Sequence, residues 1–256
     1  EGLKWFNQDL NAWDTSSATD MSWMFSDAYA FRGEIGSWNV SKVKIMQFMF
    51  QNAYVFNQDL SAWDVSSLKD AYGMFETDEV RPSIFNQPLN TWKVSTLREA
   101  KRMFLRASSF NQDLDSWDLS SVTRTEGMFE DAASFNGKVG SWNTSRVNDM
   151  AYMFLNTPFN QDVGNWDVSA VTTFHSMFEG AASFNQDISR WNVSKSSDYE
   201  LMFKDATSFN QSLCDWAWNL SGAPISGVFG GTSCLVADTP NQTVSCWLCE
   251  SSDGGL

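Results

Sequence analysis

Histidine, cysteine, proline and positive charge are all scarce in this sequence of 256 residues. The single histidine, His175, has no partners that would complete a catalytic set, and a lone histidine of this kind is usually a surface or packing residue. The Gly230-Gly231 pair is too short for a phosphate-binding loop. We therefore predict that the chain is not an enzyme and that it uses no cofactor or metal ion.

The shortage of positive charge excludes one class of partner. With 17 Lys and Arg residues against 31 Asp and Glu residues, the formal net charge is −14 and the isoelectric point is near 4.3. Such a field repels the phosphate backbones of nucleic acids and bare anionic membrane surfaces. A run of about eighteen apolar residues, which a membrane-spanning helix needs, is also missing. The sequence thus predicts no nucleic acid partner and no transmembrane segment.

Cysteine is confined to one end of the chain. The four cysteines are Cys214, Cys234, Cys246 and Cys249. An even number clustered in this way favours two disulfides in a C-terminal cap, residues 217–256, and an oxidising compartment. The sequence allows three disulfide pairings of these four cysteines. A four-cysteine zinc site is the weaker alternative, because the spacing lacks the two Cys-x-x-Cys knuckles of a zinc ribbon.

What the sequence has in abundance is repetition. A block close to Phe-Asn-Gln-Asp-Leu-x-x-Trp-Asp-Val-Ser recurs, and the spacings of its tryptophans are 25, 25, 29, 25, 25, 24, 25 and 25 residues. A fixed period in this range is typical of a solenoid, in which each repeat forms one coil and packs on its neighbours. We predict a repeat solenoid over residues 1–216. Its nine coils are expected to begin at Phe6, Phe31, Phe56, Phe85, Phe110, Phe135, Phe159, Phe184 and Phe209.

Two hydrophobic patterns follow each other within a coil. Trp63 and Val65 stand two residues apart, which places both side chains on the inner side of a short strand. Apolar residues then recur at helical spacing, as Val43, Met46 and Phe50 do in the second coil. The sequence therefore predicts an α/β solenoid in which each coil contributes one short parallel strand and one helix.

An asparagine follows the first phenylalanine of the coil in eight of nine cases, and Arg32 is the exception. An asparagine that recurs at a bend can bond backbone groups of its own turn or of the next coil. We predict a structural ladder rather than a ligand site. Its members are Asn7, Asn57, Asn86, Asn111, Asn136, Asn160, Asn185 and Asn210.

Two sets of acidic residues are candidates for a contact surface. The first is the outward column after the tryptophans, whose carboxylates alternate with Asn or Lys and lie too far apart to share a calcium ion. The second is the insertion at residues 76–84, which accounts for the four extra residues in the third tryptophan spacing. The candidate contact residues are Asp14, Asp64, Asp118, Asp167, Glu76, Asp78 and Glu79.

The repeat block, best seen over residues 56–71 and 110–122, closely resembles the BspA-like surface-protein repeat of the leucine-rich-repeat superfamily. The resemblance extends from about Phe6 to Trp216 and implies a leucine-rich-repeat-like solenoid. Proteins of that family are mostly exposed at the cell surface, and some are adhesins. The resemblance thus implies an extracellular or cell-surface location and an interaction role, and it transfers no catalytic residue.

Sequons for N-glycosylation agree with a secreted protein, although serine-rich repeats produce them by chance as well. The candidates are Asn39, Asn143, Asn192, Asn219 and Asn241, with Asn210 a further match in the asparagine column. Residues 1–5 before Phe6 align with residues 179–183 before Phe184. This alignment predicts that further repeats or a leader precede Glu1.

Three functions agree with these features. The first is a non-catalytic scaffold at the cell surface that acts in protein–protein interaction, adhesion or filament assembly, with other proteins or further copies of itself as partners. The second is a carbohydrate-binding module of a larger secreted protein, for which glycans would be the ligand. The third is the non-catalytic arm of an enzyme. Because recurring residues are expected to hold the coils together, we look for function at the interruptions of the period.

Overall fold

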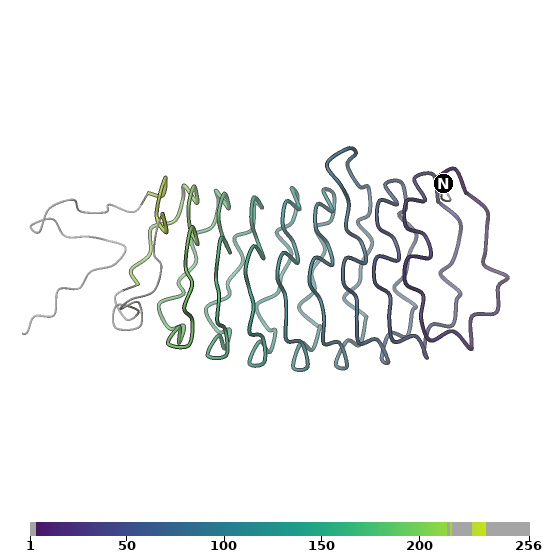
Figure 1. The fold of residues 1–256 in the computed structure, drawn as a ribbon, viewed down its shortest axis with the longest axis horizontal. Helices are drawn as coiled ribbons and strands as arrows, with labels where there is room; N and C mark the ends of the chain where they lie inside the picture. Colours follow the sequence, from purple (N-terminus) through teal and green to yellow (C-terminus); the bar gives the residue numbers. More distant parts are fainter. Residues whose placement is uncertain (1–3, 214–215, 217–226, 234–256) are drawn as a thin grey trace, which may run out of the picture.

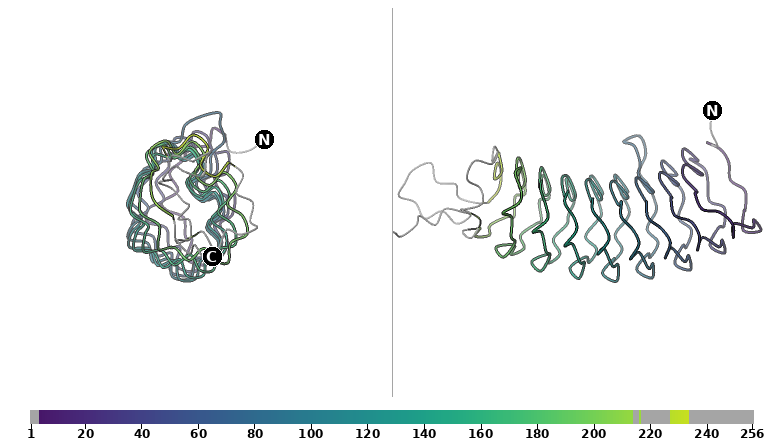
Figure 2. Two further views of the ribbon diagram at one scale, coloured as in Figure 1. Left: turned by 90° about the vertical axis from the view of Figure 1, so that its left-hand side faces the viewer. Right: turned by 60° about the horizontal axis from the view of Figure 1, so that its bottom comes forward.

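The computed structural model describes residues 4–213, 216 and 227–233. Successive coils of the chain stack along one axis and form an elongated solenoid (Figure 1). Seen along this axis, the coils superimpose around a common interior (Figure 2). Seven parallel bridges link one residue of each coil to the next, from Asp20 through to Asp198. The period of the sequence is therefore the period of the fold.

The predicted composition of the coil is wrong. The described residues contain no α-helix and no strand longer than a single bridged residue, so the chain is not an α/β solenoid with one strand and one helix per coil. The parallel bridges lie at Asp70 and its equivalents, beyond the segment 60–68 in which we expected the strand. Residues 60–68 form turns instead, with Trp63 N donating to Leu60 O and Leu68 N donating to Val65 O.

The segment expected to be helical forms a ribbon of overlapping turns, which we call the turn ribbon (residues 100–107 in the fourth coil). Two of its residues have positive φ, 53° at Arg102 and 57° at Arg106, and no residue of a right-handed α-helix has this conformation. Met103, Leu105 and Ala107 each donate a backbone hydrogen bond three residues back. The other coils repeat the pair of positive φ angles four residues apart, as at Tyr152 and Asn156, except the third coil, where Gly73 alone has a positive φ.

The remaining amide groups of the turn ribbon bond to the next coil. The amides of residues 100, 102, 104 and 106 donate to the carbonyl oxygens of residues 124, 126, 128 and 130 at 2.8–3.2 Å. Since every second N–H group leaves its own coil, a helix with i to i−4 bonds cannot form. Consecutive turns still place apolar residues three and four apart, which is why the pattern resembled a helix.

The interior is filled by columns of stacked aromatic rings. Trp92 and Trp117 stack at 6.2 Å between ring centroids, and the same contact recurs from coil to coil. Phe104 stacks on Phe110 at 4.2 Å and on Phe129 at 5.5 Å, so two phenylalanine columns interlock. All five side chains are buried. Such burial stabilises by about 1.5–3 kcal/mol for each large apolar side chain.

Polar ladders run beside the aromatic columns. The backbone amide of Asn111 donates to Oδ1 of Asn86 at 2.9 Å, and the amide of Asn136 donates to Oδ1 of Asn111 at 2.8 Å. The asparagine column therefore joins each coil to the next. Arg32 interrupts it, because its side chain carries no acceptor for the amide of Asn57.

Within the described residues, no helix is long and apolar enough to cross a membrane.

Candidate functional site

The turn ribbon carries the outward side chains that differ most from coil to coil. Phenylalanine, tryptophan and methionine recur at the inward positions, whereas two outward columns change in charge, size and polarity. We call these two columns the variable face. The first column is Asp20, Ile45, Asp70, Glu99, Arg124, Asp149, Thr173 and Asp198, and the second, two residues later, is Ser22, Gln47, Tyr72, Lys101, Glu126, Ala151, His175 and Glu200.

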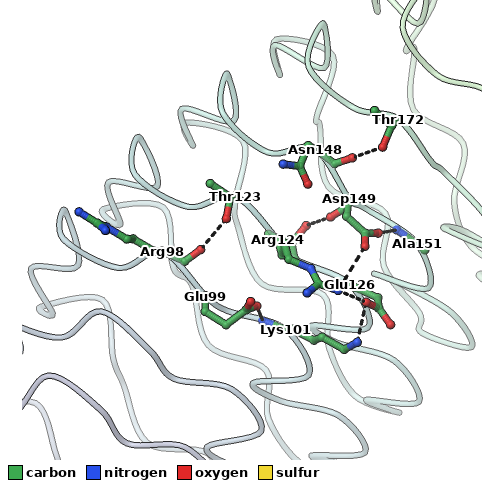
Figure 3. Close-up of polar contacts among 11 residues, drawn as sticks. Arg98, Glu99, Lys101, Thr123, Arg124, Glu126, Asn148, Asp149, Ala151 and Thr172 are labelled. Atoms are coloured by element: carbon green, nitrogen blue, oxygen red, sulfur yellow. Dashed lines mark hydrogen bonds and ion pairs between the residues drawn. The ribbon is translucent and has the colours of Figure 1, made fainter.

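The middle of the variable face is a network of charges that spans three coils (Figure 3). Lys101 Nζ lies 2.7 Å from Glu126 Oε2, and Arg124 lies 3.0 Å from the same oxygen and 3.8 Å from Asp149 Oδ2. These groups are half-buried. Burial opposes the ionisation of Glu126, but the hydrogen bond and charge of Lys101, helped by Arg124, lower its pKa on balance. The two cations therefore favour the carboxylate form of Glu126.

The pKa values of two further carboxyl groups in this region are shifted in the opposite direction. Burial raises the pKa of Glu99, although the backbone amide of Lys101 donates to its Oε1 at 3.0 Å. Burial likewise raises the pKa of Asp149, against the hydrogen bond from the Ala151 amide and the charge of Arg124. The coils hold these carboxylates in a partly dehydrated layer, where a partner that brought a cation would gain more than at a fully exposed site.

Towards the first coil the charged network continues into aromatic rings. Lys101 Nζ lies 5.9 Å from the ring centroid of Tyr72, Tyr72 meets Phe48 edge to face at 4.6 Å, and Phe48 stacks on Trp23 at 4.1 Å. Trp23 is 52% exposed. Tryptophan, tyrosine and arginine side chains are enriched at the centres of protein interfaces, whereas lysine is depleted there.

The insertion at residues 76–84 forms a loop that projects beyond the neighbouring coils (Figure 1). The guanidinium of Arg81 lies 5.8 Å from the ring centroids of both Tyr29 and Tyr54. Glu79 forms an ion pair with Arg106 at 3.0 Å, and the Ile84 amide donates to the carbonyl oxygen of Tyr54. The insertion is thus anchored to coils on both sides.

An open depression of about 410 Å³ lies between the insertion and the following coils. Arg81, Arg106 and Asp131 contribute to its walls, and Val80 beside it is 75% exposed. An exposed apolar side chain at the tip of an anchored loop, next to charges of both signs, has the composition of a contact site.

The predicted contact residues fall into two groups. Glu76, Asp78 and Glu79 all belong to the insertion. Glu76 is half-buried, and its Oε2 has no hydrogen-bond partner among the described residues. Burial raises the pKa of Glu76 despite the charge of Arg102. The four aspartates of the other column lie outside the turn ribbon and are exposed. Hydrogen bonds from the side chain and from the backbone amide of the serine two residues later lower the pKa of each of these aspartates: Asp14, Asp64, Asp118 and Asp167.

The sequons at Asn39, Asn143 and Asn192 occupy this aspartate column. All three asparagines are exposed. The hydroxyl of the serine at the third sequon position donates to the asparagine Oδ1 at 2.7–2.8 Å. Asn219, Asn241 and the four cysteines, with the predicted cap and disulfides, lie outside the described residues.

Comparison with protein-family models assigns the repeat. One model, described as Mycoplasma protein of unknown function, DUF285, matches residues 1–83, 80–158 and 137–241. The chain belongs to the DUF285 family. No curated protein and no solved structure matches it. The three overlapping matches agree with the uniform stacking of the coils, and the family description names no ligand, activity or partner for DUF285 members.

The sequence pattern does not predict the variable face, because the apolar spacing of the segment that carries it is that of a helix. Its signal was nevertheless available. In the DUF285 repeat, residues one period apart are neighbours, so Lys101 and Glu126 could have been paired from their separation of 25 residues. The contacts of Arg81 had no such signal, since the insertion has no counterpart in the other coils.

Proposed function

We propose that this chain is a non-catalytic repeat scaffold that binds another protein through the variable face and the insertion at residues 76–84. The observation that carries the proposal is the difference between the recurring positions and the variable positions of the coil. Side chains that recur in every coil pack or bond between coils, whereas the outward positions of the turn ribbon vary and are partly exposed. In a repeat protein, surface positions that the buried core does not require can be adapted to a partner.

The distribution of residue types favours a protein over a nucleic acid as the partner. The variable face combines Tyr72 with the ion-paired Lys101 and Arg124, and the exposed ring of Trp23 lies beside it. Mixed charge and exposed aromatic rings suit a polypeptide surface, while a net charge of −14 repels phosphate backbones.

We place this scaffold outside the cell or at its surface. The resemblance of the repeat block to BspA-like surface proteins supports this location, as do exposed sequons at Asn39, Asn143 and Asn192. Intact-mass measurement of the protein from its native source, before and after glycosidase treatment, tests the modification. An unchanged mass would remove the sequons as support for secretion.

The binding experiment compares capture of surface proteins by the wild type and by variants. In one variant, Tyr72→Ser, Lys101→Ser and Arg124→Thr introduce residues that Ser22 and Thr173 already carry in the same columns. A second variant lacks residues 79–82, which returns the coil to the common length. The control, Lys42→Ser with Lys195→Ser, removes two exposed cations outside the turn ribbon.

We expect the wild type and the control to capture a protein that neither the triple variant nor the deletion variant captures. All four chains should unfold at similar temperatures. Equal capture by all four chains would contradict the proposal. If both variants still capture the partner and free glycans abolish this capture, the carbohydrate-binding alternative would be favoured. The exposed ring of Trp23 offers a stacking surface for a sugar.

A further inference from the structure

The seventh and eighth coils bring the only histidine of the chain to two carboxylates. His175 Nδ1 lies 3.5 Å from Asp198 Oδ2, and single ligand atoms of His175, Asp198 and Glu200 all lie within 4.8 Å of one another. All three side chains are half-buried at the variable face. The cluster lies outside the buried aromatic columns that fill the interior.

The repeat geometry explains why these residues meet. His175 and Glu200 occupy the second column of neighbouring coils, and Asp198 stands in the first column, bridged to Thr173. Residues one period apart lie about 4.8 Å apart along the stack. On the variable face, donor atoms from two neighbouring coils can therefore meet at one site. The aspartates of the Asp118 column are too widely spaced to do so.

Hydrogen bonds fix the orientation of the central carboxylate. Asp198 Oδ1 accepts from the Glu200 amide at 3.0 Å, and Oδ2 accepts from Thr173 Oγ1 at 3.2 Å. The hydroxyl oxygen of Thr173 in turn accepts from the His175 amide at 3.2 Å. Partners of this kind set the direction of metal-ligating groups and reduce the cost of ordering them on binding.

The charge around the cluster is not balanced. Lys204 Nζ lies 2.8 Å from Glu179 Oε1, so the neighbouring cation already has a carboxylate partner. Among the described residues, no lysine or arginine forms an ion pair with Asp198 or Glu200, and the ring of Tyr152 covers His175 at 5.1 Å. The negative charge of two carboxylates beside one imidazole therefore favours the binding of a cation.

We propose that His175, Asp198 and Glu200 bind one divalent transition-metal ion, such as Zn²⁺ or Co²⁺, which ties the seventh coil to the eighth. One imidazole nitrogen and two carboxylate oxygens form a borderline donor set that these ions accept, with water in the open positions. The set has too few oxygens for a calcium site, which needs six to eight. Small rotations of the partly exposed side chains bring the three donors to bonding distance.

The test uses Co²⁺ as the probe and the full chain without a polyhistidine tag. Because His175 is the only histidine, its imidazole NMR signals report on one site alone. His175→Gln introduces the residue that Gln47 carries in the same column, and Asp198→Thr introduces that of Thr173. Asp20→Thr is the matched control, since it makes the same substitution in the first column of a coil that lacks histidine.

We expect one Co²⁺ to bind per chain, to perturb the imidazole signals of His175, and to raise the unfolding temperature. The affinity should fall at least about tenfold in His175→Gln and Asp198→Thr and stay unchanged in Asp20→Thr. Binding that survives both substitutions, Co²⁺ bound with thiolate charge-transfer absorption from the cysteines alone, or no binding at millimolar Co²⁺ would each overturn the proposal.

Discussion

The indole Nε1 of Trp117 donates a hydrogen bond to the carbonyl oxygen of Leu89 in the preceding coil at 2.8 Å. The same oxygen accepts the backbone amide of Trp92 at 3.1 Å, so both of its lone pairs are used. The tryptophan column thus joins neighbouring coils by ring stacking and by a buried hydrogen bond. This contact recurs with the same geometry at Trp142 and Leu114.

Trp117→Ala should lower the free energy of unfolding by about 3–5 kcal/mol, because it removes the ring and leaves a cavity between stacked coils. Trp117→Phe should cost about 1–3 kcal/mol, since a ring remains but the hydrogen bond to Leu89 is lost. Trp13→Ala is the internal control. Trp13 stands in the same column but is 55% exposed, so its loss should cost much less. Denaturant unfolding of the variants measures the difference, and equal costs at both positions would contradict the assignment of the core.

Arg32→Asn should stabilise the solenoid. The substitution supplies the missing Oδ1 acceptor for the amide of Asn57 and completes the asparagine ladder, a gain of about 0.5–1.5 kcal/mol. Arg190→Asn, which removes an equally exposed cation away from the ladder, controls for the change of charge. A rise in unfolding temperature for Arg32→Asn alone is the expected result, and an equal effect of both substitutions would show that charge is responsible.

Glu130→Gln should stabilise the protein at neutral pH and lose this effect in acid. Burial, reinforced by Asp131, raises the pKa of Glu130 against the charges of Arg102 and Arg106. A carboxyl group whose pKa is raised on folding favours the folded state while it is protonated, and this contribution is lost as the pH rises through the folded pKa. Glutamine removes the buried charge. Thermal unfolding at several pH values checks the prediction, with Glu34→Gln as a control for the loss of one exposed negative charge.

Asp118→Asn should have the opposite dependence on pH. Hydrogen bonds from the side chain and backbone of Ser120 lower the pKa of Asp118. Its contribution to stability is present above the unfolded pKa and disappears as the pH falls through the folded pKa. Asparagine keeps the acceptor, as Asn143 does with Ser145. The variant should therefore match the wild type in acid and lose a small margin of stability at neutral pH, which the same thermal unfolding series would reveal.

The sequence determined the solenoid and the identity of its interior. A tryptophan and two phenylalanines recur in each period, with a methionine in all but the ninth, and Trp92, Phe104 and Met128 are buried as their recurrence indicates. The recurrence of asparagine after phenylalanine likewise singled out the residues whose Oδ1 atoms accept hydrogen bonds from the next coil. Strict periodicity is sufficient here, because a residue that recurs in every coil meets copies of itself.

Only the tertiary structure decided the path of the backbone between those residues. Apolar spacings of three and four are shared by an α-helix and by overlapping turns, and local sequence does not separate them. The choice depends on amide groups such as those of Arg102 and Phe104, which bond to Glu126 and Met128 of the neighbouring coil rather than within their own. Likewise, the placement of Arg81 over Tyr29 and Tyr54 follows from an insertion without a periodic counterpart. The period fixes what repeats, whereas contacts between coils fix the conformation and the surface that does not repeat.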